Sequence, residues 1–236
     1  MSLKAVLFDL DGTLLPMDQD EFIKTYFHRL AAKLAQHGYE PKTLVAAVWA
    51  GTTAMIKNTG EKTNETVFWD VFAAQLGEQV RQDLPLFDEY YRTEFQTVRE
   101  VCGFDPQAAQ TVEAIKRMGL RVALATTPIF PSIATESRMR WAGLTPETFE
   151  LYTTYENIGF AKPNPMYFAE VAQRLGVPPE QCLMVGNDVD DDMPAREIGM
   201  QVFLLTDHLI NKKETDISQY PHGGFSELLS YLKTVM

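Results

Sequence analysis

Apolar residues recur along the chain with two different spacings, and the change of spacing divides it into three stretches. A short apolar run over 4–9 predicts a buried β-strand near the amino end. From about 16 to 98, apolar residues recur at intervals of three and four, which is typical of amphipathic helices. Beyond about residue 99, short apolar runs alternate with helical patterns to the end of the chain.

Four helices are expected in the stretch 16–98. The first begins after Asp18, with Glu21 three residues later, which is the arrangement of a helix cap. The apolar faces of the four helices contain Phe22, Tyr26, Leu30 and Leu34; Val45, Val48, Trp49 and Met55; Val67, Phe68, Val71, Phe72 and Leu76; and Phe87, Tyr90, Tyr91, Phe95 and Val98. We expect these aromatic residues to pack as core rather than to contact a ligand, whereas Ile129 and Phe130 suit either role.

The remainder of the chain predicts an α/β fold. Strands are expected at 120–126, 149–156, 182–186 and 202–205, separated by helices at 106–118, 132–142 and 165–175, a short helix that ends at 198, and a final helix at 225–232. This alternation predicts a parallel sheet with right-handed crossovers. The helical stretch interrupts it after the first strand, so we interpret residues 16–98 as an inserted second domain and residues 1–15 and 99–236 as the core.

Composition limits the partners and the compartment. The 236 residues carry a net charge of −11, which argues against nucleic acid and anionic membranes as partners. An anionic small substrate stays possible because a bound metal ion reverses the local field. No apolar run approaches the ~20 residues of a membrane helix, and no secretory signal pattern precedes the first strand. Cys102 and Cys182 are expected to be buried, reduced thiols of a cytoplasmic protein.

Polar residues follow four of the predicted strands or loops. Asp9 and Asp11 come after the first strand, and Thr126 and Thr127 after the strand 120–126. A loop with Lys162 follows the strand 149–156, and the strand 182–186 leads into the sequence GNDVDDD. Because ligands of open parallel sheets bind beyond the carboxyl ends of the strands, these groups are expected to converge on one edge.

The chemistry that these groups share is phosphoryl transfer. Clustered carboxylates repel one another, and Mg²⁺ stabilises them while it also binds phosphate oxygens. One carboxylate can attack phosphorus, and a second can protonate the leaving oxygen and then activate water. A lysine and a hydroxyl can hold the phosphoryl oxygens as charge redistributes.

These four segments resemble the motifs of the haloacid dehalogenase superfamily in its phosphatase form. DLDGTL, at 9–14, looks like the first motif, Thr126 the second, Lys162 in KPNPMYF the third, and GNDVDDD, at 186–192, the acidic fourth. The resemblance covers the predicted core in the family's order, and the helical insert resembles the cap domain that the family places there. It implies a Rossmann-like parallel sheet core with an inserted α-helical cap.

The resemblance also implies roles for individual residues. Asp9 is the nucleophile and a metal ligand, and Asp11 is the general acid and base, with its backbone carbonyl on the metal. Thr126 and Lys162 act in catalysis and bind the phosphoryl group, and Thr127 contributes to substrate binding. Gly12 suits a sharp turn with positive φ that points both aspartates at one place.

The fourth motif leaves the metal ligand open between Asn187 and Asp188. The family's usual spacing points to Asn187, whereas charge points to Asp188, because Mg²⁺ binds a carboxylate more strongly than an amide oxygen. We expect Asp188 to be the ligand, Asn187 to lie beside it, and Asp192 to hold Lys162 or a metal-bound water. Asp190 and Asp191 are expected to be solvated bystanders at the start of a helix.

The expected function is a Mg²⁺-dependent phosphoric monoester hydrolase that acts on a small phosphorylated metabolite through an aspartyl-phosphate. Alternatives are a phosphomutase or a phosphonate hydrolase on the same scaffold, or a catalytically silent regulatory protein. A phosphonate hydrolase of this family needs a lysine from the cap, and five lysines lie in the insert: Lys24, Lys33, Lys42, Lys57 and Lys62. The dehalogenase branch lacks a second acid, so Asp11 argues against it. Neither the substrate nor the oligomeric state follows from the sequence.

Overall fold

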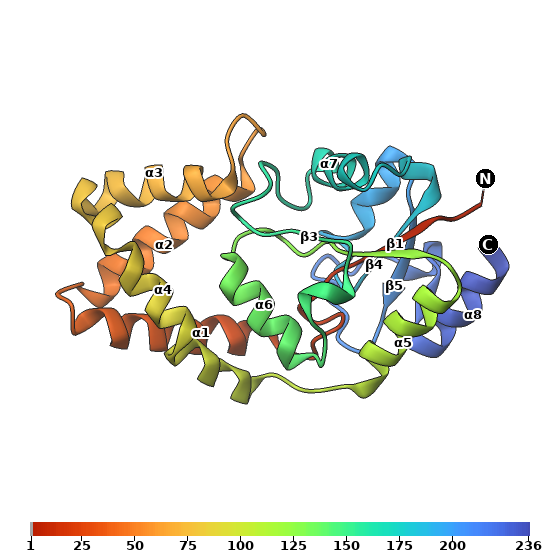
Figure 1. Ribbon diagram of the computed structural model, residues 1–236, viewed down its shortest axis with the longest axis horizontal. Coiled ribbons are helices and arrows are strands. Elements are labelled where there is room, and N and C mark those ends of the chain that lie inside the picture. The colour runs from red at the N-terminus through yellow and green to blue at the C-terminus, as the bar shows by residue number, and fades with distance from the viewer. Residues whose placement is uncertain (1) are drawn as a thin grey trace.

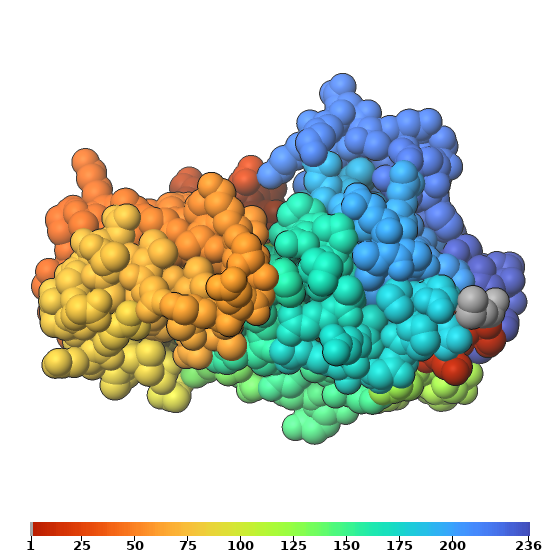
Figure 2. All heavy atoms as spheres, turned by 90° about the horizontal axis from the view of Figure 1, so that it is seen from above, coloured from red at the N-terminus to blue at the C-terminus, as the bar shows by residue number. Residues whose placement is uncertain are grey.

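A computed structural model describes residues 2–236, so Met1, the first residue of the predicted core, lies outside the described residues. A group of helices forms one end of the elongated molecule, and a sheet flanked by helices forms the other (Figure 1). Figure 2 shows the same two parts packed against each other, the helical part in orange and yellow and the sheet part in green to blue.

The sheet has six parallel strands in the order β3-β2-β1-β4-β5-β6, which confirms the predicted parallel α/β fold. The strands are β1 Ala5–Phe8, β2 Arg121–Leu124, β3 Leu151–Tyr152, β4 Cys182–Gly186, β5 Gln201–Leu205 and β6 His222–Gly223. β1 lies between β2 and β4, with Phe8 opposite both Leu124 and Val185. The residues that follow β1, β2 and β4 therefore emerge side by side.

β1 is buried on both faces, which explains its continuous apolar sequence. Val6 and Phe8 belong to a hydrophobic cluster with α5 and α8, whereas Ala5 and Leu7 belong to a second cluster with α7. Figure 1 shows α7 over one face of the sheet and α5 and α8 over the other. The helices of this part are α5 Pro106–Arg117, α6 Ser132–Trp141, α7 Pro165–Leu175 and α8 Phe225–Val235, with short 3₁₀ segments η3 Pro146–Thr148, η4 Pro179–Gln181, η5 Met193–Ile198 and η6 Ile217–Gln219.

The helical part follows β1 directly, as the spacing of its apolar residues predicts. Its elements are α1 Gln19–Ala35, α2 Pro41–Ile56, α3 Asn64–Leu76, η1 Glu78–Asp83, α4 Leu84–Arg92 and η2 Glu94–Val101. The Asp18 side chain accepts a hydrogen bond of 2.9 Å from the backbone N–H of Glu21, so the predicted cap of α1 is confirmed.

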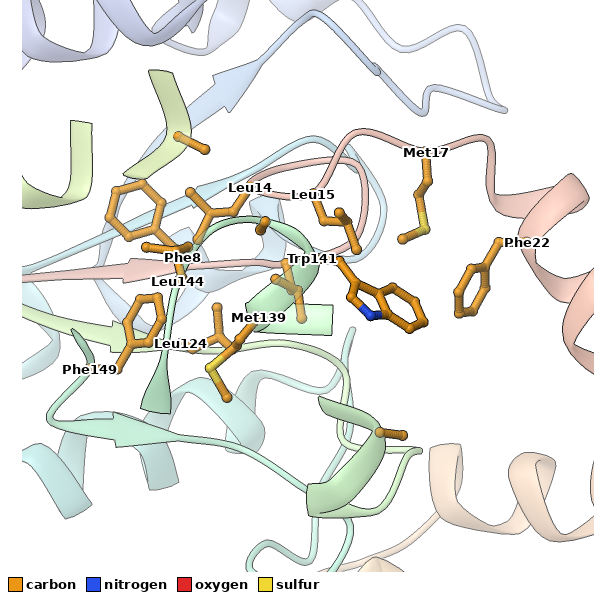
Figure 3. Close-up of a cluster of buried hydrophobic side chains, with 14 of the residues drawn as sticks. Phe8, Leu14, Leu15, Met17, Phe22, Leu124, Met139, Trp141, Leu144 and Phe149 are labelled. Atoms are coloured by element: carbon orange, nitrogen blue, oxygen red, sulfur yellow. The ribbon is translucent and has the colours of Figure 1, made fainter. Parts of the chain in front are cut away.

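One hydrophobic cluster joins the helical part to the sheet. Figure 3 shows Trp141 of α6 beside Met17 and Phe22, with Phe8 and Leu14 of the same cluster farther along. The ring of Trp141 also stacks on Phe95 of η2 at a centroid distance of 5.2 Å. Because this cluster is continuous, α6 fixes where the helical part stands relative to the ends of the strands.

Two predicted elements differ from the structure. The expected helix through Phe87 and Val98 is broken at Thr93, whose φ of −117° and ψ of −90° end α4, and η2 follows. The expected strand 149–156 pairs only at Leu151–Tyr152, because the chain turns away after Thr153 and the N–H of Tyr155 bonds to Phe130. The two-residue strand β6 was not predicted.

Two expectations from composition concern membrane-spanning segments and the two cysteines. Within residues 2–236, no helix is both long enough and apolar enough to span a bilayer. Cys102 and Cys182 are both free thiols; Cys182 is buried as expected, whereas Cys102 is partly exposed.

Candidate active site

The loop after β1 begins the site, and it depends on a glycine. Gly12 has a φ of +80°, as expected, and a Cβ atom there would lie 2.3 Å from Nδ2 of Asn187. Both constraints favour glycine, since other residues rarely adopt that φ and no space is left for a side chain. The turn brings the loop after β1 against the loop after β4.

Asp9 stands at the end of β1 and is largely buried. Its Oδ1 accepts a hydrogen bond of 2.8 Å from Nζ of Lys162. Its Oδ2 lies 3.1 Å from Oγ1 of Thr13, and the same hydroxyl lies 2.9 Å from Oδ1 of Asn187. The Thr13 proton can be donated to only one of these oxygens at a time. Asp9 is thus held at one oxygen by Lys162 from a distant segment and at the other by Thr13 of its own loop.

Lys162 is the buried cation of the site, with 2% of its surface exposed. Besides Asp9, its Nζ donates to Oδ1 of Asp192 over 2.6 Å. Burial alone would lower the pKa of Lys162, but the charges of Asp192 and Asp9 outweigh it and raise that pKa above its usual range. Lys162 is therefore an ammonium ion at neutral pH, held between two carboxylates.

Asp11 points to a partner that the sequence did not reveal. Its Oδ2 forms an ion pair with Nη1 of Arg138, a residue of α6 that is 1% exposed. The guanidinium also lies over the ring of Phe130, 4.4 Å from the centroid. The other oxygen of Asp11, Oδ1, is buried without a hydrogen-bond partner among residues 2–236. Burial raises the pKa of Asp11 to about 6, although the charge of Arg138 opposes the rise.

Thr126 and Thr127 follow β2 and line the same cavity as the acids. Thr126 is buried, and its backbone carbonyl accepts hydrogen bonds from Oγ1 of Thr153 and from the hydroxyl of Tyr167. Within the described chain its own hydroxyl has no protein partner. This arrangement fixes the backbone of a residue that lines the cavity and leaves its hydroxyl without a protein partner.

The acidic loop after β4 divides into residues with different surroundings. Asp192 holds Lys162 and also accepts a bond from the N–H of Asp188, so it is part of the buried network. Asp190 forms an exposed ion pair with Lys213, as suits a bystander. Asp191 was expected to be a bystander as well, but it lines the cavity, and burial together with the nearby Asp188 charge raises its pKa to about 6.

Asn187 and Asp188 differ in the hydrogen bonds that their side-chain atoms make. The amide of Asn187 is 1% exposed, and besides its Thr13 contact it donates to the carbonyl of His208 over 2.7 Å. Oδ1 of Asp188 accepts the N–H groups of Asp190 and Asp191, whereas Oδ2 has no partner among residues 2–236. Burial raises the pKa of Asp188, and the nearby charge of Asp9 adds to the rise. Asp188 therefore has a free carboxylate oxygen near Asp9.

The donors at this place suit a hard divalent cation. Within the described chain, no three side chains of acids, histidines or cysteines form a ready cluster. The available donors are instead the carboxylates of Asp9 and Asp188 and the backbone carbonyl of Asp11, to which no group donates among residues 2–236. Mg²⁺ keeps several waters and is commonly bound by one or two carboxylates plus substrate phosphate, so this oxygen set fits it.

All the predicted site residues thus lie together at the carboxyl edge of the sheet. Sequence reasoning missed Thr13, which bridges the loops after β1 and β4, and Arg138, which pairs with Asp11. DLDGT contains Thr13 and could have suggested it, whereas nothing in the local sequence marks Arg138 among the arginines of α6.

A cavity of about 300 Å³ opens from these residues toward the helical part. Its floor includes Asp9, Asp11, Thr126, Lys162 and Asp188, and its walls come from α1, α2, α3 and α4 and from the loop that contains Phe130. Ile129 and Phe130, for which core and ligand roles were left open, both line it. The cavity can hold a small molecule with one end against the acids.

Comparisons with known proteins agree on the family. The model of the haloacid dehalogenase-like hydrolases matches residues 3–199. A glyceraldehyde 3-phosphate phosphatase from Methanopyrus kandleri is 25% identical over 193 residues, which cover 81% of this chain and 78% of that protein. A phosphoglycolate phosphatase from Nitrosospira multiformis is 25% identical over 208 residues, covering 87% and 84%.

Among solved structures, a 2-haloacid dehalogenase from Pseudomonas syringae pv. Tomato matches with a TM-score of 0.64 at 20% identity, covering 98% of this chain and 99% of that one. At this identity the match shows the shared fold alone. The choice between chemistries on that fold depends on the residues of the site.

Proposed function

Because this chain belongs to the haloacid dehalogenase-like hydrolases, we propose that it is a Mg²⁺-dependent phosphatase that hydrolyses a small phosphorylated metabolite through an aspartyl-phosphate on Asp9. The observation that carries the proposal is the buried network in which Lys162 joins Asp9 to Asp192, with Asp11 two residues beyond Asp9. A nucleophilic carboxylate, a cation against it and a second acid are the groups that this reaction needs.

In the first step, an oxygen of Asp9 forms a bond to phosphorus as the bond from phosphorus to the leaving oxygen breaks. Asp11 gives its proton to that leaving oxygen. Lys162 and the hydroxyl of Thr126 hold the phosphoryl oxygens, whose negative charge redistributes during the transfer.

In the second step, water attacks the phosphorus of the aspartyl-phosphate and gives a proton to the Asp11 carboxylate. The bond between phosphorus and Asp9 breaks, which restores the free carboxylate and releases inorganic phosphate. Asp9, Asp188 and the carbonyl of Asp11 would hold Mg²⁺, which when bound supplies positive charge against both the carboxylates and the phosphoryl group. One domain, residues 16–98, would act as a cap that shields these steps from bulk water.

We assign Arg138 the role of positioning Asp11. Its guanidinium pairs with one carboxylate oxygen of Asp11 and is itself fixed between the ring of Phe130 and hydrogen bonds from its Nε and Nη2 atoms to Ala134 and Thr135. The other oxygen of Asp11 stays free to exchange a proton with the leaving group.

The direct test is release of inorganic phosphate from a panel of phosphate monoesters with Mg²⁺, alongside 2-chloropropionate as a dehalogenase substrate. Phosphate release without chloride release supports the proposal, whereas chloride release alone would replace it. A phosphonate hydrolase gains no support from the structure, because none of Lys24, Lys33, Lys42, Lys57 and Lys62 lines the cavity.

The general-acid role predicts an effect that depends on the leaving group. With an alkyl phosphate, Asp11→Asn should lower kcat/KM, which covers only the steps up to release of the leaving group, by ~10²-fold or more, because an alkoxide needs a proton to leave. With 4-nitrophenyl phosphate the loss of kcat/KM should be much smaller, since nitrophenolate is stable without a proton, whereas kcat should fall with both substrates because water attack also needs Asp11. Arg138→Gln should show the same dependence in weaker form, as measured by steady-state kinetics with both substrates.

Arg140→Gln is the matched control, because Arg140 lies on the same helix but is exposed and two residues away from Arg138. It should leave the ratio of the two kcat/KM values unchanged. A purely structural role for Arg138 would lower kcat/KM with both substrates equally, and that result would contradict the assignment.

The metal ligand predicts different effects for two neighbouring residues. Asp188→Ala should raise the Mg²⁺ concentration for half-maximal activity by roughly 10–100-fold, because it removes a carboxylate oxygen that has no protein partner and can bind the metal. Asn187→Ala should raise it less, since its amide is engaged by Thr13 and His208. The measurement is a Mg²⁺ titration of activity for both variants, and the reverse order would assign the ligand to Asn187.

A further inference from the structure

The walls of the cavity are aromatic beyond its acidic floor. Trp49 of α2 lies 5.2 Å from Phe27 of α1 between ring centroids, and Phe68 of α3 lies 5.6 Å from Trp69 and 6.4 Å from Tyr155. All five rings line the cavity. Trp49 and Phe68 were expected to pack as core rather than to contact a ligand, but the structure shows that they pack against other rings and also border the open space. A molecule held by its phosphate at the floor would have its other end among these rings.

Three large apolar side chains on these walls are exposed to water. Trp49, Ile56 and Leu84 are 45%, 43% and 37% exposed, and all three line the cavity. When a ligand covers a large apolar side chain that is exposed to water, the free energy falls and binding is favoured. Since these three residues belong to the same cavity as Asp9, what covers them is best identified as the far end of the substrate.

The charged residues that line the cavity argue against a substrate with a second negatively charged group besides its phosphate. Among residues 2–236, Lys162 is the only cation that lines it, and Lys162 already lies between Asp9 and Asp192. From the helical part the only charged residue on the wall is Asp88. A carboxylate or a second phosphate at the far end would lie among aromatic rings beside Asp88, without a cation to pair with.

We propose that the substrate is a phosphate monoester whose alcohol part is apolar, an alkyl or aryl group, and carries no second negative charge. This inference rests on the proposed phosphatase function and narrows it. The proposed substrate differs from the compounds that the names of the two relatives described above give. Phosphoglycolate carries a carboxylate next to its phosphate, and glyceraldehyde 3-phosphate is a polar triose.

The test compares kcat/KM for phosphate release across n-alkyl phosphates from ethyl to hexyl, and for 6-(phosphonooxy)hexanoate, which matches hexyl phosphate in length but ends in a carboxylate. We expect kcat/KM to rise about fourfold with each methylene, from ~0.8 kcal/mol for each buried CH₂. We expect hexyl phosphate to exceed 6-(phosphonooxy)hexanoate by about tenfold or more, because the terminal carboxylate would lie among aromatic rings beside Asp88.

Variants locate the effect in the cavity. Trp49→Ala should lower the ratio of kcat/KM for hexyl phosphate to that for ethyl phosphate by about tenfold, because it removes a wall that only the longer chain reaches. Met166→Ala is the matched control, since Met166 is 52% exposed on α7 and does not line the cavity. It should leave the ratio unchanged.

The outcomes separate the inference from the function on which it rests. Hydrolysis that is flat along the series, or as fast with 6-(phosphonooxy)hexanoate as with hexyl phosphate, overturns the apolar substrate and leaves the phosphatase intact. A ratio that Trp49→Ala does not alter overturns the site for the alkyl chain. Failure to release phosphate from every ester overturns the proposed function and the inference together.

Discussion

Asp9→Asn should abolish phosphate release, with a loss on the order of 10⁴-fold or more, the scale seen when a covalent nucleophile is removed. The amide has nearly the shape of the carboxylate but cannot attack phosphorus, and no other carboxylate can replace Asp9 between Lys162 and Thr13. Steady-state release of phosphate from 4-nitrophenyl phosphate measures the effect.

Asp190→Asn is the matched control for Asp9→Asn. Asp190 pairs with Lys213 at the surface, outside the network of Lys162, so its variant should keep the activity of the unmodified protein. Substantial turnover by the Asp9→Asn protein, with its fold intact by circular dichroism, would contradict the role of Asp9 as nucleophile.

Exhaustive chelation should reduce activity to background, and added Mg²⁺ should restore it. Asp9, Asp188 and Asp191 border the floor of one cavity, and without a divalent cation their charge repels a phosphate dianion. The measurement is phosphate release before chelation, after it and after a Mg²⁺ titration, with the melting temperature as a check that the fold persists. Full activity after chelation would contradict a metal-dependent mechanism.

The sequence predicted best those features that depend on residues close together in the chain. The cap of α1 is an example, because Asp18 bonds to an N–H only three residues later. The convergence of Asp9, Thr126, Lys162 and Asp188 was predictable for a different reason: each follows a strand or its loop, and parallel strands end at a common edge.

The features that sequence analysis missed depend on tertiary contacts. Asp11 and Arg138 are 127 residues apart in the sequence. Arg140 lies two positions later on α6, and nothing in the local sequence favours Arg138 over Arg140 as the partner of Asp11. Asp190 and Asp191 are adjacent acids, yet one pairs with Lys213 at the surface and the other lines the cavity. Such outcomes follow from packing that no local pattern encodes.

The spacing of apolar residues also could not distinguish a wall of a cavity from a buried core. Periodicity identifies the face of α2 that contains Val48 and Trp49, but the same pattern results when that face packs on protein or borders an open space. Trp49 does both, since it contacts Phe27 and remains 45% exposed.

The central claim, transfer of the phosphoryl group to Asp9, is tested most directly by trapping the phosphorylated enzyme. Asp11→Asn protein with Mg²⁺ is mixed with a substrate labelled at phosphorus, quenched in acid and digested, and the labelled peptide is identified by mass spectrometry. The account predicts that the label lies on Asp9, and that protein with Asp9→Asn in addition carries none. Label on another residue, or release of phosphate at full rate by Asp9→Asn protein, would contradict it.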